Sequence, residues 1–454
     1  GQAKPAFTAL GSDVWNTGIG KVGALLTLSY QDRSYREDSA TNNAVATSTT
    51  YVPGETVTYP NGAYNTMFIG DRRRTGLDGV LQWQPTDDFQ TYAEASSEDF
   101  VWAQNQYTFT SSGSPTIVPG SLTLFPGTTD VQNVTWSDAT VGTVGAWRTV
   151  EDVDRQFALH AKWTPAPWTV DGDLRYTKAT ERLNNPAVKI GANVDDLTQL
   201  NSLSGVPESI VTNADGSAFD MSDLANYSGT ASNYLSYMYD TEQHFRGGEV
   251  AARADATYAF PGGFLDSLEF GLRYADRKDA FNQWSDFGAV TTAGIQGNSQ
   301  WFGEVPLSPF FSATESNAVQ PQYIVFNPNE LRYNLLGVDQ ALGIAPAVDN
   351  GSADYHVDEH NYAGYFRLNF GAQDWWIPMT GNIGVRMVRH EDDMTGELGN
   401  GGVYTPSEFK SSLNIPLPSL NLTFKLLPDL QLRLAASKAV TYPDFKQRRP
   451  SISL

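Results

Sequence analysis

Charged side chains at every second position are the first residues of this sequence whose types and spacing could contact a ligand. They are Asp171, Asp173, Arg175, Arg253, Asp255 and Arg273. Because side chains alternate between the two faces of a β-strand, carboxylates and guanidinium groups spaced in this way lie on one face. Such a row could line a route for a polar substrate, or its members could pair with one another across neighbouring strands. Pairing is the simpler interpretation, and the substrate route stays open beside it.

Aromatic side chains close to the charged segments are a second group that could bind a ligand. Tyr234, Tyr237 and Tyr239 precede a predicted strand, and Trp284 and Trp301 lie in the longest predicted loop. Aromatic rings in loops stack on sugar rings, and they also pack loops together. We therefore predict these five residues as candidate substrate contacts, with loop packing as the alternative for each.

Metal and catalytic chemistry have weaker support. The segment His356-Val-Asp-Glu-His360 holds two histidines, but the third ligand and the open coordination position of a zinc site are missing. The acidic run from His390 to Glu397 lacks the spacing of a calcium-binding loop, so calcium in the acidic loops is the only cofactor considered. No nucleophile elbow, phosphate-binding loop or zinc-protease motif is present. We predict no catalytic and no metal-ligating residues, and therefore not an enzyme.

Composition excludes several classes of protein. The net charge of −21 argues against nucleic-acid binding, which requires a basic surface. The absence of cysteine excludes a disulfide framework and a thiolate metal site. No apolar run approaches the roughly 18 residues of a transmembrane helix. The sequence has no signal peptide at Gly1, and we expect it to be a fragment of a longer protein.

The elements that position the charged rows are predicted β-hairpins with one apolar and one polar face. In segment 156–177, Phe157 and Leu159 alternate with polar residues before a Pro-Ala-Pro turn, and Leu174 and Tyr176 do so after it. This turn is too short for any connection other than an antiparallel hairpin. An apolar face for lipid, a polar face for a lumen and a tryptophan at the turn end of each strand are typical of a transmembrane β-hairpin.

Connection lengths predict how the hairpins assemble. Short turns occur near Pro85, Pro165, Pro261, Trp375 and Pro428. Long polar loops are predicted at about 36–65, 102–150, 182–242, 278–355 and 390–412. Short and long connections alternate strictly along about eleven strands, so all short turns lie at one end, as in outer-membrane barrels. A soluble β-sandwich explains the alternation within strands but not this asymmetry. The predicted fold is all-β, a transmembrane antiparallel up-and-down β-barrel.

Four segments carry a family resemblance. The stretch from Leu432 to Leu454, which includes Ala-Ser-Lys-Ala-Val-Thr-Tyr-Pro-Asp-Phe, is similar to a characteristic motif of TonB-dependent outer-membrane receptors. Segments 15–26, 91–95 and 384–389 resemble the same family, in the proteobacterial subgroup associated with carbohydrate uptake. One departure is Tyr442, because the subgroup usually has a basic residue before the Pro-Asp pair. The likeness follows the strands and is absent from the loops.

The resemblance implies a barrel of about twenty-two strands whose lumen is plugged by an N-terminal domain. It implies a receptor of the bacterial outer membrane that imports a scarce nutrient, with an oligosaccharide as the expected ligand. Energy for import would come from the TonB–ExbB–ExbD complex, through a TonB box and plug that these residues do not include. Residues 1–454 are then a partial barrel domain in contact with outer-membrane lipid. The charged row above would face the lumen, where its members could also contact the plug.

Two other functions fit the same barrel. A passive porin or a surface-anchored adhesin would use the strands and loops without energy coupling. An outer-membrane hydrolase would need a serine with a histidine, or paired carboxylates, on the lumen face. The positions of the five histidines test the hydrolase hypothesis.

Overall fold

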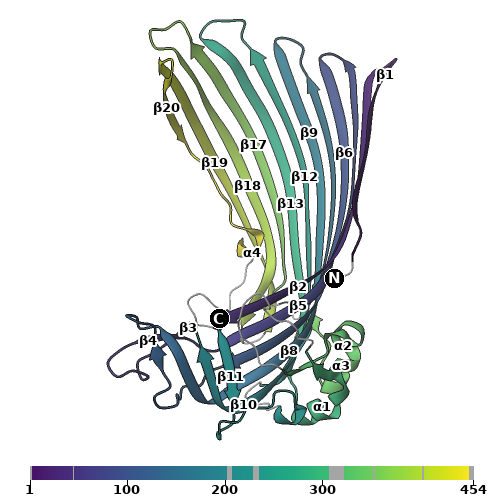
Figure 1. Cartoon of the computed structure of the whole chain (residues 1–454). Coiled ribbons are helices and arrows are strands. Elements are labelled where there is room, and N and C mark those ends of the chain that lie inside the picture. Colours follow the sequence, from purple (N-terminus) through teal and green to yellow (C-terminus); the bar gives the residue numbers. More distant parts are fainter. Residues whose placement is uncertain are drawn as a thin grey trace.

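The computed structural model describes residues 3–43, 45–201, 207–228, 235–305, 322–349, 351, 353–400 and 403–448. Within these ranges, sixteen strands join into one sheet, and two further sheets have two strands each. The long strands pair antiparallel and mostly in chain order, so the topology is up-and-down (Figure 1). The sheet forms a tall curved wall, with short turns at one end and a broad, splayed layer at the other. The prediction of an all-β antiparallel fold is confirmed.

The long strands of the wall are β1 (Ala6–Thr17), β2 (Gly20–Asn42), β5 (Ala63–Thr86), β6 (Phe89–Ser112), β8 (Val131–Trp163), β9 (Trp168–Asn184), β10 (Ala187–Leu200), β12 (Tyr237–Ala259), β13 (Leu265–Ala289), β17 (Tyr355–Ala372), β18 (Met379–Asn400), β19 (Val403–Leu427) and β20 (Leu430–Ser437). Short strands are β3 (Val45–Ser48), β4 (Val57–Pro60), β7 (Thr123–Leu124), β11 (Glu208–Thr212), β14 (Phe302–Glu304), β15 (Ile324–Phe326) and β16 (Val348–Asp349). The helices are α1 (Thr292–Gly297), α2 (Pro328–Tyr333), α3 (Leu335–Leu342) and α4 (Phe445–Arg448), with 3₁₀ turns at Leu224–Asn226 and Ser299–Trp301.

The two faces of the wall differ in polarity. Large apolar side chains lie at alternate positions on one face, and many are exposed, such as Leu81 (64%) and Leu272 (71%). This apolar face ends, beside the short turns, in a row of exposed tryptophans. These are Trp83, Trp163, Trp168, Trp375 and Trp376. An exposed apolar band with an aromatic girdle is the surface that a barrel presents to lipid. The opposite face, called the polar face below, carries the charged residues.

The turn between β1 and β2 shows how the short-turn end is fixed. Gly20 has a φ of +108°, and a Cβ there would lie 2.3 Å from the carbonyl oxygen of Gln84. Only glycine fits this position, because a side chain would meet both a conformational and a steric penalty. The indole nitrogen of Trp83 donates a hydrogen bond of 2.9 Å to the carbonyl oxygen of Ile19. The turn is therefore attached to the neighbouring hairpin.

The longest strand, β8, has two partners in succession along one edge. Its last part pairs with β9, and its first part pairs with β10. The break between β9 and β10 falls at Asn185 and Pro186, where proline has no N–H for the ladder. The carbonyl oxygen of Pro186 still accepts a hydrogen bond of 3.1 Å from the Trp147 amide. Because β8 itself is continuous from Val131 to Trp163, its two faces continue from the wall into the splayed layer.

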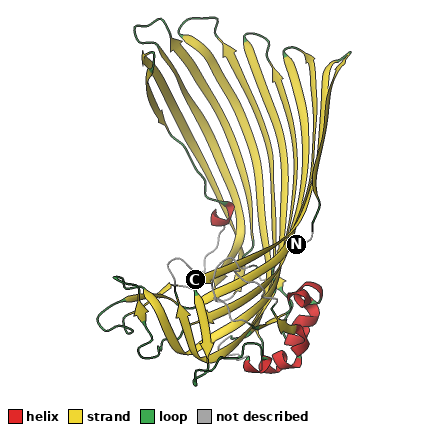
Figure 2. Cartoon of the chain, viewed as in Figure 1, coloured by secondary structure: helices red, strands yellow, loops and turns green. Residues whose placement is uncertain are grey.

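The splayed layer has its own hydrophobic core. The segment after β13, with α1, α2, α3 and β15, packs against β8 and β10, and the three helices cluster at this end of the molecule (Figure 2). Trp136, Phe326 and Leu331 are completely buried. At Gly145 of β8 a Cβ would lie 1.9 Å from the carbonyl oxygen of Phe326, so the segment touches the strand backbone.

No helix in the described ranges has the length and apolar character needed to cross a membrane.

The strands extend further than the sequence analysis predicts. β6 continues to Ser112 and β8 begins at Val131, both inside the loop predicted at 102–150. β18 and β19 fill most of residues 390–412, so the loop predicted there is wrong. A bilayer requires only about 9–11 residues of each strand. Beyond that depth a strand loses its apolar alternation, but its backbone ladder continues because pairing needs no apolar side chain.

Candidate functional site on the polar face

An ion-pair lattice occupies the polar face near the short-turn end. Arg253 of β12 contacts Asp173 at 2.9 Å and Asp171 at 3.3 Å on β9, and Asp255 at 3.1 Å on its own strand. His160 of β8 lies 2.9 Å from the second oxygen of Asp173. The register sets these contacts, since Arg253 stands directly opposite Asp173 and Asp173 opposite His160. The lattice is thus formed by ion pairs between side chains of neighbouring strands, which is the simpler of the two interpretations of the charged row.

The two other charged residues of the predicted row lie beside this lattice. Arg175 and Arg273 line a depression of about 130 Å³, together with Asp173, Glu249 and Arg253. The three arginines are exposed and the two carboxylates are partly buried, and ion pairs in such surroundings stabilise a fold by only about 0–1 kcal/mol each. All six predicted residues therefore share one face.

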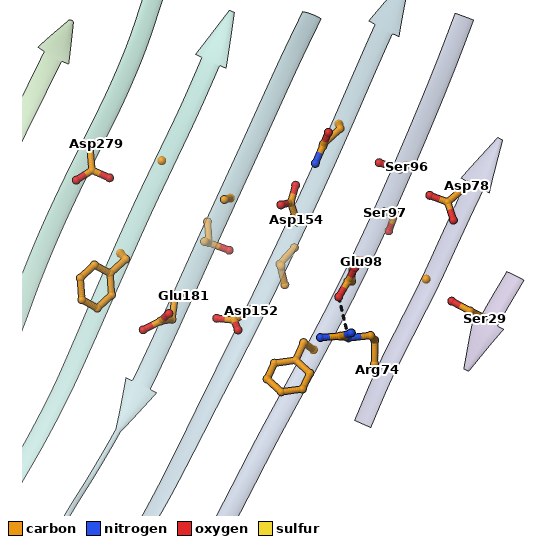
Figure 3. Close-up of a pocket in the computed structure, with 18 residues that line it drawn as sticks. Ser29, Arg74, Asp78, Ser96, Ser97, Glu98, Asp152, Asp154, Glu181 and Asp279 are labelled. Atoms are coloured by element: carbon orange, nitrogen blue, oxygen red, sulfur yellow. Dashed lines mark ion pairs between the residues drawn. The ribbon is translucent and has the colours of Figure 1, made fainter. Parts of the chain in front are cut away.

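A larger groove lies further from the short turns on the same face. It has a volume of about 650 Å³ and crosses the strands from β2 to β13. Its charged lining is Arg74, Asp78, Glu98, Asp152, Asp154, Glu181 and Asp279. In Figure 3 these carboxylates come from successive strands, and only Glu98 is joined to Arg74, at 2.9 Å. We call this feature the acidic groove. Six carboxylates and one cation give it a strongly negative potential.

The acidic groove also offers hydroxyl groups and aromatic surface. Ser29, Ser96 and Ser97 line it on one side, and Phe100 and Phe245 contribute rings. Serine hydroxyls both donate and accept hydrogen bonds, whereas ionised carboxylates only accept. The groove can therefore accept several donors from one ligand and can cover an apolar ligand face with a ring. Its residues were not predicted as a site, because they lie in seven separate strands and only the register brings them together.

Strand β12 connects the groove to a group of aromatic rings at the far end of the wall. Tyr237 and Tyr239 are spaced 6.3 Å apart between ring centroids, and Phe287 of β13 lies 5.1 Å from Tyr237. Period-two alternation places Tyr237, Tyr239, Phe245 and Arg253 on one face of β12. The pairing of β12 with β13 is regular from Tyr237 to Ala259. Aromatic rings, acidic groove and ion-pair lattice therefore follow one another along a single strand.

The remaining predicted aromatic contacts lie elsewhere. Trp284 alternates to the opposite face of β13, where its ring centroid lies 4.7 Å from that of His244. Trp301 packs against the core of the splayed layer, 6.0 Å from the Phe326 ring. Tyr234 lies outside the described residues. Of the five predicted aromatic residues, Tyr237 and Tyr239 therefore lie together, and Phe287 joins them. Phe287 could have been identified from the alternation of side chains along β13.

A buried charged cluster, which the sequence analysis did not predict, occupies the polar face of β17 and β18. Arg448 of α4 contacts Glu359 at 2.7 Å and Asp392 at 2.6 Å, and Glu359 is only 1% exposed. His390 contacts Asp392 at 2.9 Å and stacks on Tyr442, with ring centroids 4.0 Å apart. Segment 438–448 therefore folds back over the polar face and is held by ion pairs and ring stacking.

Several histidines on these strands lie beside carboxylates. His356 lies 3.1 Å from Asp358, and His360 lies 3.7 Å from Asp276, so the two histidines have separate acidic partners. In the described ranges, two groups have ligand atoms close enough for a metal: His160 with Asp171 and Asp173, and Glu359 with His390 and Asp392. Arg253 and Arg448 already place a guanidinium against the carboxylates of these two groups.

The acidic run from His390 to Glu397 is also engaged with basic side chains. Asp393 contacts Lys410 at 2.8 Å, and Glu391 contacts Arg389 at 2.7 Å. These contacts neutralise Glu391 and Asp393 locally. A hydrolase would need a histidine beside a serine of the lumen face, and the contacts of His160 and His390 are with carboxylates and Asn361.

The antiparallel wall, its apolar band, its tryptophan row and its charged opposite face define a β-barrel protein of the outer-membrane type. Residues 191–452 match the model of the family described as TonB dependent receptor-like, beta-barrel. The match covers more than half of the chain, and the chain belongs to this family. No curated protein sequence matches the chain significantly. Family membership places the protein in the bacterial outer membrane, in TonB-dependent transport of a ligand.

Proposed function

We propose that this barrel belongs to a receptor that imports an oligosaccharide by TonB-coupled active transport. The observation that carries the substrate class is the lining of the acidic groove, in which six carboxylates, several hydroxyl groups and two phenylalanine rings surround about 650 Å³. This volume is within the range of about 300–1,000 Å³ that accommodates small ligands. The resemblance of the strands to the carbohydrate-associated subgroup supports the same substrate class.

The chemistry of the groove suits a neutral, polyhydroxylated ligand. Sugar hydroxyls donate hydrogen bonds, and Asp154, Glu181 and Asp279 present carboxylate acceptors for them. Phe100 and Phe245 give apolar surface for the C–H face of a sugar ring. The same carboxylates would repel an anionic ligand, and repulsion between like charges in a partly enclosed site weakens binding. The groove thus favours neutral over acidic oligosaccharides.

The position of the groove supports a route through the barrel. Tyr237, Tyr239 and Phe287 would capture the ligand at the cell surface, and the groove would hold it deeper on the same face of β12. The ion-pair lattice around Arg253 lies beyond the groove, toward the short turns. Passage along this face would require a plug domain to move, driven by TonB with ExbB and ExbD.

Binding of defined oligosaccharides to the purified receptor tests the substrate class. Isothermal titration with neutral tri- to hexasaccharides, and with uronic-acid oligosaccharides of the same length, compares neutral with anionic ligands. We expect at least one neutral series to bind, and Asp154→Asn and Phe245→Ala to weaken it about tenfold, as loss of a charge-assisted hydrogen bond or a stacking contact does. Asp374→Asn, in an exposed short turn, is the control. Tighter binding of the uronic-acid series would contradict the proposal.

A further inference from the structure

Three arginines lie on the polar face beside the acidic groove, on the side away from the short turns. They are Arg33 of β2, Arg72 of β5 and Arg148 of β8. Arg72 is two residues from Arg74 of the groove, and Arg148 is four residues from Asp152. Because side chains an even number of residues apart share a face of a strand, these arginines continue the lining of the groove. A cationic area therefore adjoins the acidic one.

The three arginines have no acidic partner. In the described part of the chain, none of them forms an ion pair or a hydrogen bond through its side chain. Other arginines of the same strands are paired, since Arg74 contacts Glu98 at 2.9 Å and Arg155 contacts Asp99 at 2.9 Å. The chain has 51 acidic residues against 30 lysines and arginines, so carboxylates are not scarce. The charges of the three arginines are thus available to a bound anion.

The strand register brings two of these charges together. Arg33 stands directly opposite Arg72 in the pairing of β2 with β5, which is regular from Lys21 to Asn42. Like charges directly opposite each other on one face destabilise a sheet. A negatively charged group beside both guanidinium groups replaces this repulsion by attraction. The pair is therefore arranged favourably only when an anion is present.

An aromatic side chain holds the other guanidinium groups in place. The guanidinium carbons of Arg72 and Arg148 lie 5.6 and 5.1 Å from the Trp102 ring centroid, and that of Arg72 lies 4.6 Å from the Tyr35 ring. The indole nitrogen of Trp102 donates to the Tyr35 hydroxyl, which donates to Oε1 of Gln104 at 2.7 Å. Both arginines are partly buried, and their Nε atoms are buried without a hydrogen-bond partner among the described residues. The two cations are therefore fixed by stacking and not by carboxylates.

Stacked guanidinium groups suit one kind of ligand. Stacking uses the flat face of the group and leaves its N–H edges free, and these edges match the geometry of carboxylate and phosphate oxygens. We propose that Arg33, Arg72 and Arg148 bind a phosphate or carboxylate group at one end of the ligand whose other units occupy the acidic groove. The assignment to a ligand end rests on the proposed function of the groove.

The spacing along β6 shows why the anionic group belongs at one end. Phe100 lines the groove, and Trp102 follows two residues later on the same face, a distance of about 7 Å along a strand. A ligand stacked on Phe100 therefore reaches the arginines with its next unit. A charge on every unit would instead meet the carboxylates of Asp154 and Glu181. One terminal anionic group agrees with the preference of the groove for neutral units.

Isothermal titration of the purified receptor with glucose 1-phosphate, inorganic phosphate and glucose, at constant ionic strength, tests the anion site. We expect glucose 1-phosphate to bind about tenfold or more tighter than glucose, and Arg72→Gln and Arg148→Gln each to weaken it about tenfold, as loss of a charge-assisted hydrogen bond does. Arg332→Gln is the matched control, because Arg332 also lies against a ring, 4.9 Å from that of Tyr333, but on α2. It should bind glucose 1-phosphate as wild type does.

A second variant separates charge from misfolding. Arg72→Lys keeps a cation without the planar fork and should recover part of the affinity that Arg72→Gln loses. Binding of glucose 1-phosphate by Arg72→Gln and Arg148→Gln within twofold of wild type would overturn the proposal, as would an affinity of Arg72→Lys no better than that of Arg72→Gln.

Inorganic phosphate distinguishes a free anion from the anionic end of a sugar ligand. Glucose 1-phosphate should bind about threefold or more tighter than inorganic phosphate, because its sugar ring adds contacts in the groove. Equal affinity for the two would overturn the assignment to a ligand end. Failure of every neutral oligosaccharide to bind is a separate result, which would contradict the proposed function while the glucose 1-phosphate titration still decides the arginine site.

Discussion

Replacing Arg448 by methionine should release segment 438–448 from the polar face. Arg448 joins two buried carboxylates, Glu359 and Asp392, through separate guanidinium nitrogens at 2.7 and 2.6 Å. Methionine keeps much of the side-chain volume but leaves two buried negative charges beside each other. Removal of one partner from a buried ion pair typically costs about 3–5 kcal/mol.

The lower end of this range applies here. Segment 438–448 can lift away and let water reach Glu359 and Asp392, so the cost cannot exceed the free energy that docks the segment. A loss of about 3 kcal/mol corresponds to a decrease of about 100-fold in the docking equilibrium, since about 1.4 kcal/mol is a factor of ten. The stacking of Tyr442 on His390 remains and limits the effect.

Hydrogen exchange measures this docking equilibrium directly. In wild type, the amides of Gln447 and Arg448 donate to the carbonyl oxygen of Asp444 and should be protected. In Arg448→Met their exchange should accelerate by about 100-fold, toward the rate of an open segment. Lys438→Met removes an exposed cation from the same segment and serves as the control. Protection in Arg448→Met within threefold of wild type would refute the role assigned to the two ion pairs.

Two other substitutions test the splayed layer and the lattice. Gly145→Ala should destabilise the packing of the splayed layer by about 1–3 kcal/mol, because its Cβ would lie 1.9 Å from the carbonyl oxygen of Phe326. Chymotryptic cleavage of the layer should therefore accelerate. Gly297→Ala is the control and should leave cleavage unchanged, because a Cβ at Gly297 has open space around it. Arg253→Gln should lower thermal stability by less than about 1 kcal/mol, since its side chain is half-exposed. A large drop in the unfolding temperature of Arg253→Gln would show that the lattice is a structural core.

The hairpins could be predicted from sequence because their period is local. Phe157, Leu159, Leu174 and Tyr176 alternate within one segment, and lipid requires the apolar side chains on one face. The same logic failed at residues 390–412, where strands β18 and β19 continue beyond the apolar band. Charged residues such as Glu391, Asp393 and Lys410 occupy this part of the two strands, and a strand rich in polar residues resembles a loop when only composition is considered.

The candidate site was less predictable because it depends on register. Arg175 and Arg253 could be assigned to one face from parity alone, but the partner of each charge follows from strand pairing. Glu359 and Arg448 are far apart in sequence, and no local pattern relates them. Trp284 was assigned to a loop, whereas it lies in β13, because the polar outer part of that strand has the composition of a loop.

Uptake of the bound oligosaccharide by cells that produce the receptor is the most direct test of the proposed transport. The measurement compares cells with TonB and cells that lack it, at an external concentration well below saturation. Active import predicts accumulation above the external concentration when TonB is present and uptake at the background level when it is absent. Equal uptake in both strains would contradict energy-coupled import and would favour a passive porin.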